Sequence, residues 1–251
     1  MTLSNLPDVD ASYLQQLVSV LQQSLHDRLV GVYLFGSAGA GHYEPGISDL
    51  DVQAVVEAPL AAPDRVALAM RLSHAELPCP ARRLEFVCYD RAAVQAAHRH
   101  PPFQLNFNTG AGGLHHLSTD PSSEASHWFL LDIALGRERG RTLHGEPLEQ
   151  VFGAVPRQWV LDAMEDSLAW HEESEPTSAN AVLNACRAWR YALTGQLGSK
   201  GEAVEWARGE DAGAAVVETA WRCRHGGPPI HREAAAAFIA SVRGALAAAK
   251  Q

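Results

Sequence analysis

Strand patterns occur only in the first half of this sequence, and this asymmetry restricts the fold more than any other feature. Short apolar segments bounded by turn residues predict three buried strands, at residues 29–35, 48–58 and 82–90. Helical periodicity predicts helices between and around them, at residues 10–29, 64–77 and 91–100. Residues 101–125 are rich in turn formers and contain one further strand-like piece.

Beyond residue 125 the pattern is helical throughout. The predicted helices cover residues 123–140, 157–173, 178–195, 199–209, 211–225 and 231–250. Ser178 is a suitable N-cap and Gly195 a suitable C-cap for one of them. Because strands and helices segregate along the chain, we expect two domains of different architecture. We place an α+β domain with a mixed sheet at residues 1–155 and an all-α helical bundle at residues 156–251.

The overall composition indicates a soluble globular protein. The chain has 47% hydrophobic and 20% charged residues, and no apolar run is long enough to predict a membrane span. The N-terminus has no basic region typical of a signal peptide, and the four cysteines are scattered. We therefore expect a cytoplasmic protein with reduced thiols. A net charge of −9 argues against nucleic-acid binding and suits a cationic ligand.

The segment LFGSAGAGHYEPGISDLDVQAVV, residues 34–56, places two acids where a buried strand is predicted. Asp49 and Asp51 are two residues apart, so their side chains should leave the same face of that strand. Two neighbouring carboxylates repel each other and are costly to remove from water. Mg²⁺ offsets both effects, and proteins typically hold it with one or two carboxylates together with substrate phosphates. The ordinary alternative is a loop with two solvated acids at a strand edge.

Small residues near these acids favour a phosphate ligand. Gly36 lets the backbone approach a ligand closely, and the Ser37 hydroxyl with nearby N–H groups can bind phosphate oxygens. Ser48 adds a second hydroxyl beside Asp49. Glu85 lies in the apolar segment RRLEFVCYD, where an acid is unusual unless it faces a site or a cation. If the two acid-bearing strands are neighbours, three carboxylates converge.

These residues carry a resemblance to a known family. The segment FGSAGAGHYEPGISDLD resembles the nucleotidyltransferase motif of the DNA polymerase β superfamily. The wider chain resembles the aminoglycoside 3″/9 adenylyltransferases, which act on streptomycin and spectinomycin, over roughly residues 25–210. The segments RRLEFV, GRERGRTLHGEPL and NACRAWRYALTGQLGSKGEAVEWA carry that similarity. The resemblance implies a polymerase β-like nucleotidyltransferase domain followed by a helical domain that helps bind ATP and the acceptor.

The resemblance also implies an activity and a set of site residues. The activity is transfer of AMP from ATP to a hydroxyl of an aminoglycoside or aminocyclitol antibiotic, with release of pyrophosphate. Asp49 and Asp51 would bind two Mg²⁺ ions and the triphosphate, and Glu85 would act as general base and further metal ligand. The residues expected to contact ATP are Gly36, Ser37, Ser48, Arg187 and Lys200. The last two would offset the charge on pyrophosphate.

The acceptor site is expected in two segments, FNTGAGG and AWHEESEP. Trp170, Glu172 and Glu175 offer an aromatic face and carboxylates that suit a cationic acceptor, and Asn108 is included from the first segment. The family's G-E-W sequence is replaced near Gly110, and a family acid falls near Thr177. Because those family positions help to hold streptomycin, we favour spectinomycin as the acceptor.

Other functions stay open at this point. The same chemistry could use a different small molecule, or a protein hydroxyl as in toxin–antitoxin nucleotidyltransferases, although the long helical half argues against a protein acceptor. The chain could also bind ATP as a sensor without transfer. The paired histidines at 98, 100, 115 and 116 lack the spacing of a zinc site. We expect a monomer whose partners are ATP and a cationic small molecule, without nucleic acid or membrane.

Overall fold

The computed structural model describes residues 5–113, 115–210 and 213–251. The chain divides into two compact units, Met1–Ala154 and Val155–Gln251. The first contains a mixed sheet with helices, and the described residues of the second form helices without strands. The predicted fold class is therefore confirmed. Within the described ranges, every helix is too short or too polar to cross a membrane.

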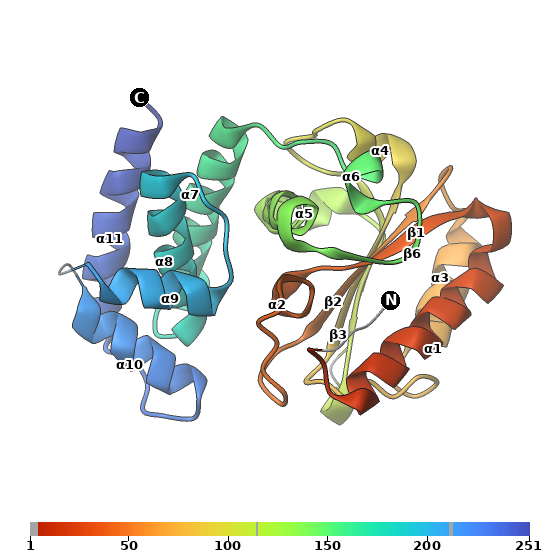
Figure 1. The fold of residues 1–251 in the computed structure, drawn as a ribbon, viewed down its shortest axis with the longest axis horizontal. Helices are drawn as coiled ribbons and strands as arrows, with labels where there is room; N and C mark the ends of the chain where they lie inside the picture. Colours follow the sequence, from red (N-terminus) through yellow and green to blue (C-terminus); the bar gives the residue numbers. More distant parts are fainter. Residues whose placement is uncertain (1–4, 114, 211–212) are drawn as a thin grey trace. The chain divides into compact units, whose positions relative to one another are not determined.

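The first unit is built on a six-stranded sheet in the order β5-β4-β3-β2-β1-β6 (Figure 1). Its strands are β1 Leu29–Leu34, β2 Leu50–Val56, β3 Leu84–Asp90, β4 Phe103–Thr109, β5 His115–Ser118 and β6 Arg141–Gly145. Strands β2 and β3 are parallel, and the other neighbouring pairs are antiparallel. The two acid-bearing strands are thus direct neighbours, as the convergence of carboxylates requires.

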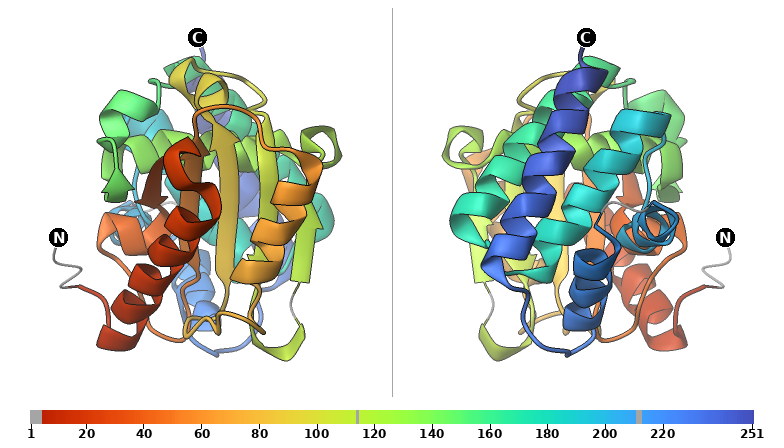
Figure 2. Two further views of the ribbon diagram at one scale, coloured as in Figure 1. Left: turned by 90° about the vertical axis from the view of Figure 1, so that its right-hand side faces the viewer. Right: turned by 90° about the vertical axis from the view of Figure 1, so that its left-hand side faces the viewer.

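Helices cover both faces of this sheet. Helices α1 (Asp8–Leu25) and α3 (Ala62–Leu72) lie side by side on one face, as the left view of Figure 2 shows. The buried leucines of α1 recur at three- and four-residue steps and pack into the main core. Helix α5 (Ser126–Arg139) lies on the other face with the short α2 (Gly36–Ala40) (Figure 1).

Several predictions for this unit are wrong in detail. The first helix ends at Leu25 rather than residue 29, because His26 adopts a positive φ and Leu29 already pairs in β1. Residues 101–125 contain two strands, β4 and β5, where one was expected. Strand β6 lies in the region expected to be helical; as a short edge strand with half-exposed polar residues, it lacks the apolar signal. The helix predicted at 91–100 is confined to α4 (Arg91–Gln95), which α6 (Leu148–Val151) contacts.

The second unit is a bundle around one central helix. Its helices are α7 Arg157–Ser174, α8 Ala179–Thr194, α9 Lys200–Arg208, α10 Ala214–Arg224 and α11 Arg232–Ala249. Helix α8 contacts each of the other four (Figures 1 and 2). The predicted caps are confirmed: Ser178 Oγ accepts a hydrogen bond from Ala181 N, and Gly195 adopts a left-handed φ of 71°.

Candidate active site

A glycine at the end of β1 lies directly against an acid of β2. Phe35 N donates a hydrogen bond to Asp51 O at 2.8 Å, so the residue after β1 is still bonded to the neighbouring strand β2. Gly36 follows with a φ of +56°, and a Cβ built there would lie 1.9 Å from Asp51 Oδ2. Only glycine therefore fits both the backbone conformation and the space. This explains why the motif needs a glycine at this distance from its acid.

Three site residues predicted from distant segments form one row across the sheet. Asp51 of β2 is paired in register with Glu85 of β3, and Glu85 with Asn108 of β4. Residues paired in register point to the same face, so the three side chains are neighbours. The row places two carboxylates beside one amide on the face opposite the leucine-rich core of α1.

The electrostatic environment of Asp51 is unfavourable for its ionised form. Burial, followed by the nearby charges of Glu85, Asp132 and Asp49, raises the pKa of Asp51 well above its ordinary value. Asp132 comes from α5 and was not among the predicted site residues. Its position inside the apolar run FLLDIAL is the one signal that could have indicated it.

The first motif acid is not on the strand. Strand β2 begins at Leu50, so the prediction that Asp49 lies on the strand with Asp51 is wrong. Asp49 precedes the strand and is held from the side of β3, where Arg83 Nε lies 3.2 Å from Asp49 Oδ2. Arg83 Nη2 also forms an ion pair with Glu85 Oε1. Arg83, another residue that the sequence analysis missed, therefore bridges the two acids.

The donor set fits a hard divalent cation. Among residues 5–113, 115–210 and 213–251, no three His, Cys, Asp or Glu side chains are already arranged around a metal position. However, Asp49, Asp51 and Glu85 supply the oxygen donors that Mg²⁺ prefers. The raised pKa of Asp51 reports a local excess of negative charge that a cation would offset. In this structure, Arg83 supplies positive charge to two of these acids.

The two predicted serines have different surroundings. Ser37 is half-buried in the first turn of α2, next to Gly36. Ser48 is buried, and its Oγ accepts a hydrogen bond from Glu44 N at 3.1 Å. Ser48 therefore closes the loop that leads into β2, and any contact with phosphate stays a prediction.

The two predicted cations of the helical unit each donate a hydrogen bond to an asparagine of α8. Lys200 Nζ donates to Asn180 Oδ1 at 2.8 Å, and Arg187 Nη1 donates to Asn184 Oδ1 at 3.3 Å. Residues 180, 184 and 187 lie on one face of the helix, because their spacing follows its period. Amide oxygens carry no net charge, so these two contacts orient the cations without neutralising them.

The residues expected at the acceptor site make contacts within their own unit. Glu172 Oε2 accepts from Arg243 Nη1 at 2.9 Å, and Glu175 Oε2 accepts from Ser178 Oγ at 3.1 Å. The ring of Trp170 packs edge-on against that of His171, with ring centroids 5.1 Å apart. These contacts stabilise the junction of α7 with its neighbours, and a role toward an acceptor stays a prediction.

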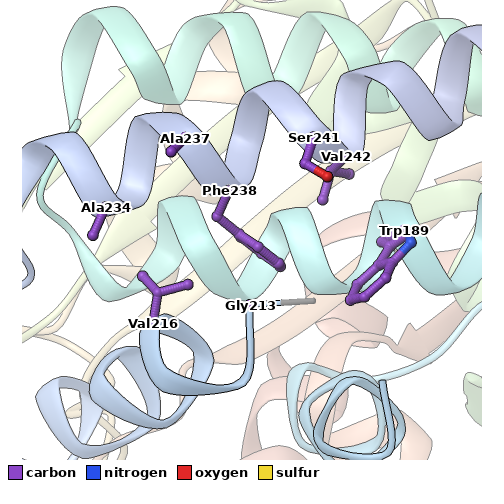
Figure 3. A pocket seen from close by; sticks show the side chains of 8 residues that line it. All are labelled: Trp189, Gly213, Val216, Ala234, Ala237, Phe238, Ser241 and Val242. Atoms are coloured by element: carbon purple, nitrogen blue, oxygen red, sulfur yellow. The ribbon is translucent and has the colours of Figure 1, made fainter. Parts of the chain in front are cut away.

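A pocket in the helical unit is separate from these residues. It has a volume of about 250 Å³ and is walled mainly by apolar groups of α8, α10 and α11, among them Trp189, Val216 and Phe238 (Figure 3). None of the eight residues that line it is a predicted site residue. The pocket offers one side-chain hydroxyl, from Ser241, and no carboxylate, so it lacks the acidic groups expected at the acceptor site.

Comparisons with known proteins find similarity to aminoglycoside adenylyltransferases in both units. Residues 150–241 match the family model described as aminoglycoside adenylyltransferase, C-terminal domain. The spectinomycin 9-adenylyltransferase of Staphylococcus aureus is 28% identical over 204 residues, which cover 76% of this chain and 75% of that protein. The aminoglycoside (3″)(9) adenylyltransferase of Klebsiella pneumoniae is 26% identical over 213 residues, 78% of each chain.

A solved structure shows the same fold over nearly the whole chain. The spectinomycin adenyltransferase of Enterococcus faecialis, crystallised with ATP and spectinomycin, has a TM-score of 0.70 and 17% sequence identity. The match covers 94% of this chain and 99% of that one. The family model over the helical unit and the relatives that align over three quarters of the chain support the aminoglycoside 3″/9 adenylyltransferase family for this protein and identify it as a nucleotidyltransferase.

Proposed function

We propose that this protein transfers AMP from ATP to a hydroxyl of an aminoglycoside or aminocyclitol antibiotic, releases pyrophosphate, depends on Mg²⁺ and prefers spectinomycin to streptomycin. The observation that carries the proposal is the row of Asp51 and Glu85 beside Gly36, because it combines closely spaced carboxylates with a backbone that a ligand can approach. The names of the relatives support the reaction class: the Staphylococcus protein is a spectinomycin 9-adenylyltransferase.

Each group then has a defined task. Glu85 would accept the proton of the acceptor hydroxyl, whose oxygen attacks the α-phosphorus of ATP as the bond to pyrophosphate breaks. Asp49 and Asp51, with Glu85, would hold Mg²⁺, which when bound stabilises charge on the transferring phosphate. Gly36 and Ser37 would face the phosphates. Arg187 and Lys200 would offset the negative charge of the leaving pyrophosphate.

The preference for spectinomycin is supported by the backbone at Gly110. A Cβ there would lie 2.9 Å from Arg82 O and 3.0 Å from Arg83 Cβ. An aromatic side chain, as in the family's G-E-W sequence, would therefore require the chain before β3 to move. Without that aromatic face, the site offers less to streptomycin, whose binding in the family uses this position.

The test is a pyrophosphate-release assay with ATP, Mg²⁺ and either spectinomycin or streptomycin. We expect Asp49→Asn to abolish turnover, and Glu85→Gln to stop transfer while ATP binding, measured by calorimetry, is kept. Glu76→Gln, at an exposed position outside the site, is the matched control and should behave as the wild type. Normal turnover by Glu85→Gln would remove Glu85 as the base, and no pyrophosphate release with either antibiotic would refute the acceptor class.

A further inference from the structure

A buried histidine is connected through an asparagine to one of the two predicted cations of the helical unit. His171, on the last turn of α7, has a side chain that is only 3% exposed. Its Nε2 lies 2.8 Å from Nδ2 of Asn184 on α8, the asparagine whose Oδ1 accepts from Arg187 Nη1 at 3.3 Å. His171, Asn184 and Arg187 therefore form a continuous chain of hydrogen bonds, which runs from α7 to the arginine predicted to bind the triphosphate.

The partners determine the direction of every bond in this chain. A guanidinium group can only donate, so the amide of Asn184 must present its oxygen to Arg187. Its NH₂ group then faces His171 and donates to Nε2, which must be unprotonated. The ring proton is thereby assigned to Nδ1, on the side where Glu175 Oε2 lies 3.6 Å away. His171 is the neutral Nδ1–H tautomer in this arrangement.

This chain selects one orientation of the Asn184 amide. If the amide turned over, its NH₂ group would face the guanidinium, a contact between two donors, and its oxygen would face the unprotonated Nε2, a contact between two acceptors. Arg187 is also held at a second point, because its Nε donates to Gly198 O at 3.0 Å. With two of its nitrogens fixed, the direction of the whole guanidinium group is determined.

We propose that His171 is a positioning residue, which acts through Asn184 to hold Arg187 in the orientation that binds the triphosphate. The inference rests on the proposed function, since it assigns Arg187 an anionic ligand. The chemistry explains why the intermediary is neutral: a carboxylate at position 184 would also hold the guanidinium, but would cancel the charge that the phosphates need. Lys200, the first residue of α9, likewise donates to a neutral amide, that of Asn180, which lies one turn before Asn184 on α8.

Two substitutions separate positioning from packing. His171→Phe keeps a ring in the buried space and removes the acceptor, so the Asn184 amide loses one of the two partners that hold it in place. We expect the Kd for ATP, measured by calorimetry, to rise about tenfold, typical of one charge-assisted hydrogen bond. His171→Gln restores an acceptor near the position of Nε2 and should recover most of the affinity. Thermal melting shows whether each variant is folded.

A double-mutant cycle tests whether the effect passes through Arg187. In the Arg187→Ala background, His171→Phe should change ATP affinity less than twofold, because the residue that it positions is gone. If His171 only packs the helical unit, the loss of affinity should persist in that background. A persistent loss, or equal ATP affinities of the wild type and His171→Phe, would overturn the proposal.

A spectroscopic measurement tests the chain of hydrogen bonds without ATP. The ¹⁵N chemical shifts of histidine rings distinguish a protonated from an unprotonated nitrogen, and comparison with His171→Gln identifies the signals of His171. We expect a protonated Nδ1 and an unprotonated Nε2; the opposite tautomer would overturn the assignment. If the wild type binds no ATP, the proposed function fails, and the tautomer still decides whether the chain of hydrogen bonds exists.

Discussion

The close approach of Gly36 to Asp51 makes a quantitative prediction for Gly36→Ala. The new Cβ would lie 1.9 Å from Asp51 Oδ2 and 2.5 Å from Cγ, so the carboxylate must retreat until these distances reach at least 3.4 Å. The left-handed φ of +56° costs an L-residue about 1–2 kcal/mol. Displacing Asp51 from its rotamer adds about 0.5–1.5 kcal/mol. We expect a total loss of about 1.5–3.5 kcal/mol in the free energy of unfolding.

The effect on activity should be larger than the effect on stability. A displacement of about 1 Å in a reacting group can lower the rate about 100-fold, and Asp51 must move farther than that. Urea unfolding followed by tryptophan fluorescence measures the loss of stability. Initial rates of pyrophosphate release, at a temperature where the variant is folded, measure the loss of activity.

Gly46 provides the matched control. It also has a positive φ, +75°, in the loop between β1 and β2, but a Cβ there would meet nothing within 4 Å. Gly46→Ala should therefore lose about 1–2 kcal/mol of stability and keep the kcat/KM of the wild type. If Gly36→Ala also keeps kcat/KM within threefold of the wild type, the reasoning that its glycine makes room for a working carboxylate is refuted.

Three further predictions concern charges and caps at the site. Burial raises the pKa of Asp51 above 3.8, so the folded state binds its proton more readily than the unfolded chain, and stability falls as the pH rises from 3.8 toward the raised pKa. Asp51→Asn should flatten this dependence of stability on pH, measured by urea unfolding, and should be more stable than the wild type at neutral pH. An unchanged dependence would contradict the raised pKa of Asp51. Ser199 caps α9 through a hydrogen bond from Glu202 N, so Ser199→Ala should lose about 1 kcal/mol and weaken ATP binding through Lys200, with Ser199→Asp as the rescuing control. Arg83→Gln should tighten Mg²⁺ binding measured by calorimetry without ATP, because the arginine no longer competes for the acids; equal or weaker binding would show that it does not compete.

Local patterns were sufficient for most helices, for the first three strands and for selecting the motif residues. Buried leucines at helical spacing indicated α1, and Ser178 and Gly195 marked the ends of α8 correctly. An acid in an apolar strand indicated Glu85. These signals are local because backbone periodicity and capping depend on residues within one or two turns.

The pairing of the strands could not be predicted from local sequence patterns. Strand β4 carries Gln104 and Asn106 between its apolar residues, and both polar side chains are buried in the sheet. Such a pattern in a turn-rich region predicts only a short strand-like piece, because burial of the polar face depends on elements far away in the sequence. Strand β6 was missed for the same reason, because its polar residues pair with β1, more than 100 positions away in the sequence.

The sequence by itself determined that two acids, a glycine and a serine lie together around a strand, and that a later strand carries a third acid. Their spacing sets which groups are near one another along the chain, and the chemistry of those groups indicates metal and phosphate. Only the tertiary structure decided which distant groups join them: the parallel register of β2 and β3 places Asp51 opposite Glu85, helix packing adds Asp132, and Arg83 bridges two acids. The charge that each acid experiences, like the hydrogen bonds behind Arg187, arises from residues brought close by burial rather than by sequence.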